Sequence, residues 1–263
     1  MDQDDGIRQV ALSVLVEQDR DDMAVDPDGL RLESLDGTIP WGTLSLICPP
    51  AWPFQTRSDL VTDLLSCAAW VRQPLPVLQE TVRVHAQPSG SRGAPGADTW
   101  AVEAVHGGVL TLGWGATGVD PARPSRVVPV ADVIWHLAGV DAWSWWGAAR
   151  ARHERDGEQC ALRWATGAFG KDQLRTVLGH DVMTLLGART LREALTGRLR
   201  SPMVSVGCPT RSTAWLLHGG VDPSFVTLAF NASQVSEQAF PHPLLVTVDE
   251  VAHPSGRPSG ALV

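Results

Sequence analysis

A pair of glycines between two β-prone runs is the feature that most constrains the fold of this chain. Residues 100–106 and 109–114 are rich in valine, leucine and tryptophan, and Gly107 and Gly108 separate them. Two adjacent glycines readily adopt the positive φ that a tight hairpin turn requires, so residues 100–114 predict a β-hairpin. A fold that contains this hairpin contains antiparallel sheet.

Helical and extended patterns are mixed along the chain without strict alternation. Apolar residues recur at helical spacing, or follow helix start signals, in residues 4–18, 58–70, 130–138, 141–155, 171–186, 191–198 and 222–238. Short β-prone runs occupy residues 29–34, 38–48, 79–85, 160–164, 203–207, 211–218 and 244–248. This mixture predicts an α+β fold with mixed, mainly antiparallel sheets and flanking helices.

A run of glycine, proline and serine suggests where the chain divides. Residues 87–98 are too polar and too rich in these residues to bury much apolar surface, so we interpret them as a flexible linker or loop. This places an N-terminal α+β domain at residues 1–86 and a C-terminal α+β domain at residues 99–252. Residues 253–263 have a similar composition and are expected to be a disordered tail.

The charge and composition argue against several classes of function. The net charge is −8 and the arginines are scattered, whereas a nucleic-acid-binding surface needs clustered basic residues, so binding to nucleic acid is not expected. No apolar run approaches the ~18 residues of a membrane span, so no membrane partner is predicted. The acidic N-terminus lacks the features of a signal peptide, and the four cysteines lie far apart without a C-x-x-C pair. We therefore expect reduced thiols and a cytoplasmic location.

The segment from Ala165 to Asp172 comes close to a phosphate-binding loop. A P-loop reads G-x-x-x-x-G-K-[ST], and Gly170 and Lys171 match its end. Ala165 replaces the first glycine, and Asp172 replaces the hydroxyl that holds magnesium. The purely structural alternative is that Gly170 and Asp172 begin a helix. A degenerate nucleotide-binding loop at Lys171 is therefore a minority hypothesis, and no cofactor is predicted.

A second enzymatic hypothesis places a pocket around Cys208, Arg211 and His218. A thiol beside an arginine can be activated as a nucleophile, but free cysteines more often pack in a core. The histidines and carboxylates have no metal-site spacing, so no metal site is predicted. Two His-Gly-Gly segments lack the G-x-S-x-G elbow of lipase-like hydrolases, which favours simple turns. No complete catalytic set is present, so an enzyme is the less favoured class.

Tryptophan is unusually frequent, with 11 residues against no tyrosine. Trp143, Trp145 and Trp146 lie close together, and Arg150 follows them. Core packing is the default interpretation for such residues. The alternative is an aromatic surface that docks a partner, because tryptophan and arginine are typical interface anchors. On this view the predicted binding residues are Trp143, Trp145, Trp146, Arg150 and Arg211.

The C-terminal part of the chain resembles an uncharacterised bacterial family of the YtpQ type. The resemblance rests on residues 204–212, 215–217, 222–223 and 239–244, with compatible runs at residues 36–40 and 57–62. It covers about half of the chain, and the tryptophan-rich middle departs from it. It implies a mixed sheet-and-helix fold of the kind used by binding proteins, without a known chemistry.

Acidity, the lack of a complete catalytic set and the excess of tryptophan beside arginine favour one function over the others. The sequence predicts a soluble, non-enzymatic factor that binds another protein in the manner of a chaperone or an immunity protein, and the acidity favours a basic partner. The competing class is an enzyme that uses the Cys208, Arg211 and His218 pocket or the loop at Lys171. A structural subunit of a larger assembly is a third class.

Overall fold

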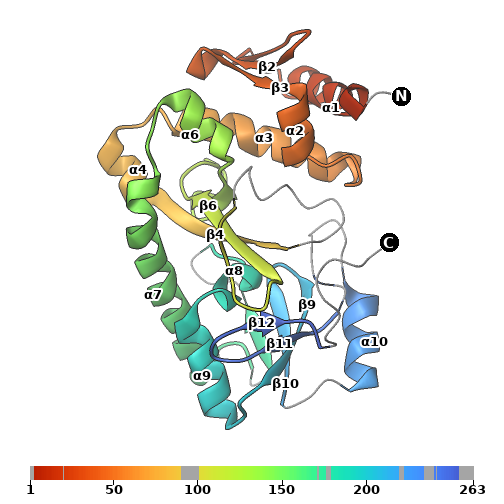
Figure 1. Ribbon diagram of the computed structural model, residues 1–263, viewed down its shortest axis with the longest axis vertical. Helices are drawn as coiled ribbons and strands as arrows, with labels where there is room; N and C mark the ends of the chain where they lie inside the picture. Colours follow the sequence, from red (N-terminus) through yellow and green to blue (C-terminus); the bar gives the residue numbers. More distant parts are fainter. Residues whose placement is uncertain are drawn as a thin grey trace. The chain divides into compact units, whose positions relative to one another are not determined.

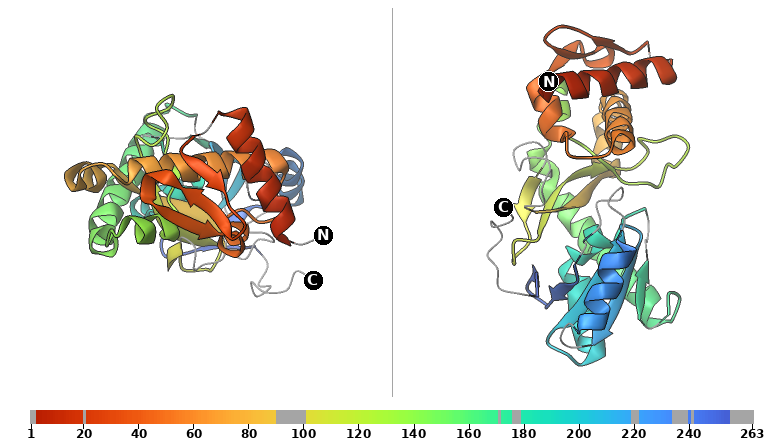
Figure 2. Two further views of the ribbon diagram at one scale, coloured as in Figure 1. Left: turned by 90° about the horizontal axis from the view of Figure 1, so that it is seen from above. Right: turned by 90° about the vertical axis from the view of Figure 1, so that its right-hand side faces the viewer.

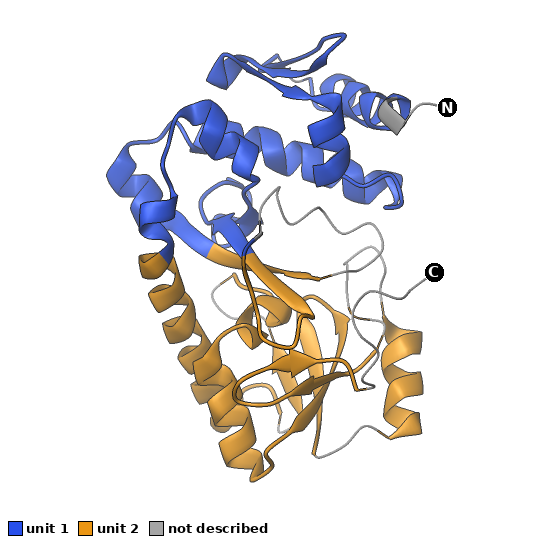
Figure 3. Cartoon of the chain, in the orientation of Figure 1, with its two compact units in different colours: residues 1–83, 92–102, 113–146 blue, residues 84–91, 103–112, 147–263 orange. Residues whose placement is uncertain are grey.

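A computed structural model describes residues 3–19, 21–89, 101–170, 172–175, 179–218, 222–233, 240 and 242–254 (Figures 1 and 2). The chain divides into two compact units (Figure 3). Unit 1 comprises residues 1–83, 92–102 and 113–146, and unit 2 comprises residues 84–91, 103–112 and 147–263. Residues 90–100 and 255–263 lie outside the described residues, so the predicted linker at 87–98, the tail at 253–263 and the domain division based on them stay predictions.

The α+β class predicted from the sequence is confirmed, because the described residues form helices and three mainly antiparallel sheets. The strand orders are β1-β2-β3, β4-β6-β5 with β7 beside β6, and β12-β11-β9-β10-β8. Strands β4 (Val82–Pro88), β5 (Ala101–Ala104) and β6 (Leu110–Ala116) each contain residues of both units. The chain therefore passes between the units several times.

Unit 1 combines a small sheet with several helices. Its remaining elements are α1 (Gln3–Glu17), β1 (Met23–Val25), β2 (Gly29–Leu32), the 3-10 turn η1 (Glu33–Leu35), β3 (Gly37–Pro40), α2 (Trp41–Ile47), α3 (Phe54–Trp70), α4 (Leu75–Thr81), β7 (Val128–Pro129), α6 (Asp132–Ala138) and the 3-10 turn η2 (Trp143–Trp145). Helix α1 packs on α2 and α3. Its apolar stripe of Ile7, Val10, Ala11 and Val14 is buried, as the helical spacing predicted.

Unit 2 is built around the five-stranded sheet. Its elements are α7 (Trp146–Ala165), β8 (Gln173–Arg175), α8 (Val182–Leu186), α9 (Arg189–Leu199), β9 (Val204–Thr210), β10 (Thr213–His218), α10 (Pro223–Ala232), β11 (Leu244–Val246) and β12 (Val251–Ala252). The first residue of α7, Trp146, belongs to unit 1. Leu174, Val206, Leu216 and Leu244 are at most 5% exposed and form the core face of this sheet. Helices α9 and α10 both pack on β9.

The predicted hairpin at residues 100–114 is confirmed as β5 and β6. Gly107 and Gly108 have φ of 100° and 69°, the left-handed values that glycine adopts without steric cost. A Cβ atom at Gly107 would also lie 2.2 Å from the carbonyl oxygen of Val251. Glycine is therefore required at this position both for the turn and for the close approach of β12.

Residues 41–47 were wrongly predicted to continue a strand from residue 38. The strand β3 ends at Pro40, and helix α2 begins at Trp41. Trp41, Leu44 and Ile47 are buried at a spacing of three residues, which places them on one helical face. The predicted helix at 58–70 is real, but α3 begins at Phe54, directly after Pro53.

Two further predictions fail in unit 2. Residues 160–164 were expected to form a strand, yet they complete α7, whose inner face buries His153, Cys160 and Trp164 at helical spacing. Residues 171–186 were expected to form one helix, yet β8 and the five-residue helix α8 occupy this segment. Gly170 and Gly179 have φ of 83° and 80°, which a continuous helix does not allow.

Candidate functional site

One face of the unit 2 sheet is only partly covered by the helix α10. Trp215 of β10 lies opposite Gly207 of β9 and Gln173 of β8, so these three residues share this face. A Cβ atom at Gly207 would lie 3.2 Å from Cζ of Phe225 and 3.3 Å from Cβ of Ala229, both on α10. The missing side chain thus lets α10 lie close to β9, as two views show (Figures 1 and 2).

A hollow of about 450 Å³ opens beside α10, over β10 and β8. Its floor contains the half-buried Trp215 and Leu217, and its wall contains Phe225 and Leu228. The lining residues are Asp172, Gln173, Trp215, Leu216, Leu217, His218, Phe225 and Leu228. The apolar side chains of this set outnumber the charged ones, which suits an apolar side chain of a bound molecule.

Helix α10 carries more apolar residues than its buried face can hold. Phe225 and Ala229 face the sheet, whereas Leu228 and Phe230 are 52% and 57% exposed. The Phe230 ring stacks on His242 with the centroids 6.0 Å apart. Leu228 lines the hollow, whereas Phe230 lies about 200° further around the helix, on the other side of α10. The exposed Leu228 therefore extends the apolar surface on which a partner could bury area.

The position of α10 is fixed at its start by the signal that the sequence predicted. Asp222 precedes Pro223, and its Oδ1 accepts a hydrogen bond of 2.8 Å from the backbone N–H of Phe225. N–H groups in the first turn of a helix have no carbonyl acceptor within the helix, and this carboxylate supplies one. Pro223 fits the first turn. The cap therefore sets the place where Phe225 enters the wall of the hollow.

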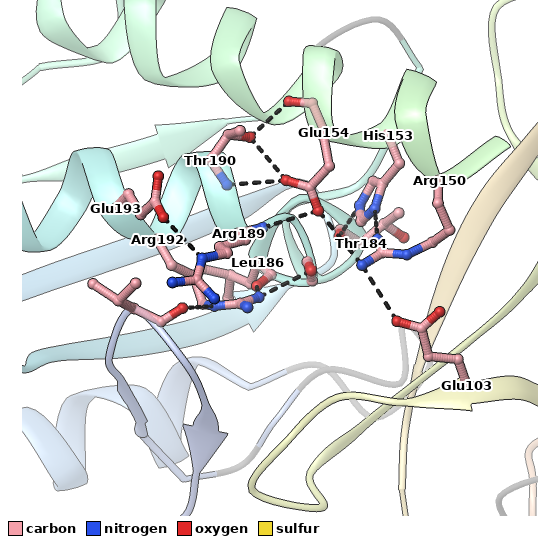
Figure 4. A network of polar contacts seen from close by, with 12 residues as sticks. Glu103, Arg150, His153, Glu154, Thr184, Leu186, Arg189, Thr190, Arg192 and Glu193 are labelled. Carbon is pink, nitrogen blue, oxygen red and sulfur yellow. Dashed lines mark hydrogen bonds and ion pairs between the residues drawn. The ribbon is translucent and has the colours of Figure 1, made fainter. Parts of the chain in front are cut away.

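Elsewhere in unit 2, a polar network joins α7, α8 and α9 (Figure 4). The residue before α9, Ala188, supplies no side-chain cap, and Glu154 of α7 takes this role instead. Its Oε1 and Oε2 accept hydrogen bonds from the backbone N–H groups of Arg189 (3.2 Å) and Thr190 (3.0 Å). Burial by itself would raise the pKa of Glu154, but these N–H groups and Arg150 outweigh it and hold the pKa below its usual range.

His153 occupies the buried centre of this network. Its Nε2 lies 2.7 Å from the carbonyl oxygen of Thr184, which can only accept, so Nε2 carries the proton. Nδ1 is then free of a proton and accepts from Arg150 Nη1 at 2.6 Å. Burial is the main cause that lowers the pKa of His153 to about 4, so the ring is neutral near pH 7 and acts as a connector.

Two arginines complete the framework by satisfying backbone carbonyls. Arg192 donates to the carbonyls of Val248, Leu186 and Gly187, which ties α9 to the end of α8 and to the β11–β12 turn. Arg211 donates through Nε to Asp181 Oδ2 at 2.7 Å and through Nη2 to the carbonyl of Ala86. Both guanidinium groups are thus occupied by structural partners.

The Cys208, Arg211 and His218 pocket suggested by the sequence does not assemble. Cys208 and Arg211 lie at one end of the β9–β10 hairpin, whereas His218 lies opposite Val204 at the other end. Val204 and Cys208 are four positions apart on β9, which is about 13 Å along a strand. Burial raises the pKa of the Cys208 thiol to about 12, so it is protonated and a poor nucleophile at neutral pH.

The described residues directly after Lys171 do not form the helix that a phosphate-binding loop requires. Lys171 lies outside the described residues, so its own contacts stay a prediction. The residues after it do not begin a helix, since Asp172 leads into β8 and its carbonyl accepts from the N–H of Leu216 at 2.9 Å. A P-loop holds phosphate at the N-terminus of the helix that follows it, and this segment provides a strand instead.

The predicted tryptophan residues lie in unit 1, and most of them point into it. Trp145 and Trp146 are half-buried and make edge-to-face contacts with Trp135 and Trp114, with centroids 6.0 and 4.9 Å apart. Trp143 is 59% exposed. Arg150 pairs with Glu103 and Glu154 in unit 2, and Arg211 is engaged by Asp181.

Sequence reasoning missed the five apolar residues that line the hollow, Trp215, Leu216, Leu217, Phe225 and Leu228. A signal for them was present. In residues 223–232, six of ten residues are Phe, Val, Leu or Ala, at positions 225, 226, 228, 229, 230 and 232, more than one helical face can bury. Such an excess indicates a second apolar face.

Within the described residues, no cluster of three or more histidine, cysteine or acidic side chains is arranged to hold a metal ion. None of the described helices is both long and apolar enough to cross a bilayer. No family model, curated protein or solved structure matches the chain. The resemblance to the YtpQ-type family and the cytoplasmic location therefore stay predictions.

Proposed function

We propose that this chain is a non-enzymatic binding protein that holds a segment of another protein in the hollow between α10, β10 and β8. The observation that supports this function is the apolar hollow of about 450 Å³, lined by Leu228 of α10, which is 52% exposed. An exposed apolar side chain beside an apolar cavity is typical of sites where a partner buries its own apolar side chains.

The charge of the chain favours a basic partner. The net charge is −8, and the exposed Asp172 lies at the rim of the hollow. A basic segment would be attracted to such a surface over a distance of about 8–10 Å at physiological salt. The predicted Trp/Arg surface is less well supported as a contact than the hollow. Trp145 and Trp146 are half-buried, and Arg150 and Arg211 are paired with carboxylates. Of this predicted set, Trp143 is the exposed residue.

A charge placed in the wall of the hollow tests this function. The 263-residue chain and its Leu228→Asp variant are used to capture proteins from a lysate of the native host, and each captured protein is then purified and its affinity measured. Leu162→Asp is the matched control, because Leu162 is 58% exposed on α7 and does not line the hollow. Burial of one leucine contributes roughly 1.5–3 kcal/mol, so Leu228→Asp is expected to weaken binding by roughly 10- to 100-fold.

The control decides the interpretation. Binding that is lost with Leu228→Asp and kept with Leu162→Asp supports the hollow as the contact. Binding that withstands Leu228→Asp, or that both substitutions weaken equally, contradicts the proposed function. Catalytic turnover of a captured molecule by the purified chain would also contradict it.

A further inference from the structure

The two edges of the unit 2 sheet differ in how their backbone groups are used. At one edge, the N–H of Val251 in β12 donates to the carbonyl of His106 at 2.9 Å, so this edge has a partner within the chain. At the other edge, β8 pairs with β10, and no other strand of the described residues joins it. An edge strand of this kind can accept a further strand.

The register shows which groups of β8 are available. Leu216 donates its N–H to the carbonyl of Asp172, and Leu174 lies opposite Ala214. In an antiparallel pair, hydrogen-bonded and non-hydrogen-bonded positions alternate, so Asp172 and Leu174 direct their backbone groups toward β10. The backbone N–H and C=O groups of Gln173 and Arg175 therefore point away from β10, toward the free edge.

The same edge borders the hollow. Gln173 lies opposite Trp215, and both line it. Neighbouring strands lie about 4.8 Å apart, and alternate side chains of a strand face the same side of the sheet. A strand added along β8 would thus place every second side chain on the side of α10, where a long apolar one reaches over Gln173 toward Leu228.

Charges mark the two ends of the edge. Asp172 and Arg175 are both exposed and lie three residues apart, about 10 Å along the strand. Opposite charges placed directly across two strands stabilise the pairing, whereas like charges oppose it. A complementary strand therefore carries a basic residue beside Asp172, an apolar residue beside Gln173 and an acidic residue beside Arg175.

We infer that the partner segment binds as an extended strand added to the free edge of β8, with an apolar side chain directed into the hollow. This inference rests on the proposed function and specifies its ligand as a peptide with the pattern basic–apolar–any–acidic, in either chain direction. Backbone hydrogen bonds to Gln173 and Arg175 provide affinity, and the hollow selects the apolar side chain, as in other cases of strand addition.

A display library of random heptapeptides tests this inference. The 263-residue chain is used for selection, and peptides that also bind the Leu228→Asp variant are removed. The strongest remaining peptide is synthesised as a set in which each backbone N–H in turn is methylated. Strand addition predicts that methylation at alternate positions weakens binding to the wild-type protein by at least 10-fold and at the intervening positions by less than 3-fold.

A variant pair tests the same bonds from the side of the protein. Gln173→Pro removes the outward N–H and is compatible with an edge position, whereas Gln173→Ala keeps this N–H. We expect Gln173→Pro to weaken peptide binding by at least 5-fold and Gln173→Ala by less than 2-fold, with unchanged circular dichroism for both. The methylated peptides give an independent answer with unaltered protein if Gln173→Pro does not fold.

The outcomes separate the inference from the proposed function. Methylation effects without alternation, combined with lost binding to Leu228→Asp, would overturn strand addition while keeping the hollow as a binding site. A selection that yields no peptide sensitive to Leu228→Asp would overturn both. A concentration-dependent dimer that Gln173→Pro disrupts and Gln173→Ala preserves would assign the edge to a second copy of this chain and overturn the partner segment.

Discussion

Replacing Glu154 tests how α9 is held, because this side chain caps a helix to which it does not belong. Glu154→Ala removes the acceptors of the Arg189 and Thr190 N–H groups, and Ala188 has no side-chain cap to replace them. Losing a cap costs about 1 kcal/mol, and a hydrogen bond to a charged group contributes about 1.5–3 kcal/mol. The Glu154 side chain is 27% exposed, so water partly compensates for the loss. We expect a cost of about 2 kcal/mol for Glu154→Ala.

Amide hydrogen exchange measured on peptides from α9 is the suitable assay, because it reports opening of this region separately from unit 1. A change of about 2 kcal/mol corresponds to roughly 30-fold faster exchange. Glu154→Gln keeps one acceptor oxygen without the charge and is expected to lie between the wild type and Glu154→Ala. The control is Glu158→Ala, one helical turn further along α7 at an exposed position. Exchange in α1 should stay unchanged in all variants.

The pH dependence provides a second check with a defined sign. The folded-state pKa of Glu154 is lowered from its ordinary value of 4.5, so its contribution is complete above about pH 4.5 and is lost as the pH falls through the folded pKa. The stability difference between the wild type and Glu154→Ala should therefore shrink below pH 4.5. The reasoning is refuted if Glu154→Ala exchanges α9 within 2-fold of the wild type, or if Glu158→Ala has the same effect.

Three further predictions concern buried groups. All four cysteines are buried, and burial raises the pKa of three of them to about 12. A thiol reagent at pH 8 should therefore react slowly with the native protein, and it should label all four thiols after unfolding in urea. Rapid labelling of the native protein would contradict this. Burial lowers the pKa of His153 from 6.5 to about 4. The neutral ring therefore contributes fully to the stability of the folded state above pH 6.5, and this contribution declines as the pH falls toward 4. Urea midpoints measured across this range should depend less on pH for His153→Gln than for the wild type. Arg126 donates to both carboxylate oxygens of Asp63, at 2.8 and 2.7 Å. Arg126→Ala leaves the buried Asp63 carboxylate without this partner and should destabilise unit 1 by about 3 kcal/mol. Adding Asp63→Ala in a double-mutant cycle should recover part of this loss.

Local signals in the sequence were reliable where one residue determines the backbone. Gly107 and Gly108 predicted the β5–β6 turn, and both adopt positive φ. Asp222 and Pro223 predicted the start of α10, and the Asp222 side chain forms the cap. In these cases the information lies within four residues, so the local conformation depends little on distant contacts.

Apolar runs without such a signal were ambiguous. Residues 160–164 contain Cys160, Ala161, Leu162 and Trp164, which fit a short strand as well as the end of a buried helix. They belong to α7 because Cys160 and Trp164 continue the buried face that begins at Ala149. The longer period decides the assignment, and it becomes visible only when the whole helix is packed.

The sequence by itself determined the α+β class, the β5–β6 hairpin and the start of α10, because glycine conformation, helix capping and residue periodicity act over a few neighbouring residues. Tertiary structure alone decided that Gly207 admits α10 onto β9, that Trp215 and Leu217 form the floor of a hollow, and that the backbone groups of β8 that point away from β10 lie beside it. The physical reason is that strand register and helix packing depend on which distant apolar surfaces leave water together, and a linear pattern does not specify that pairing.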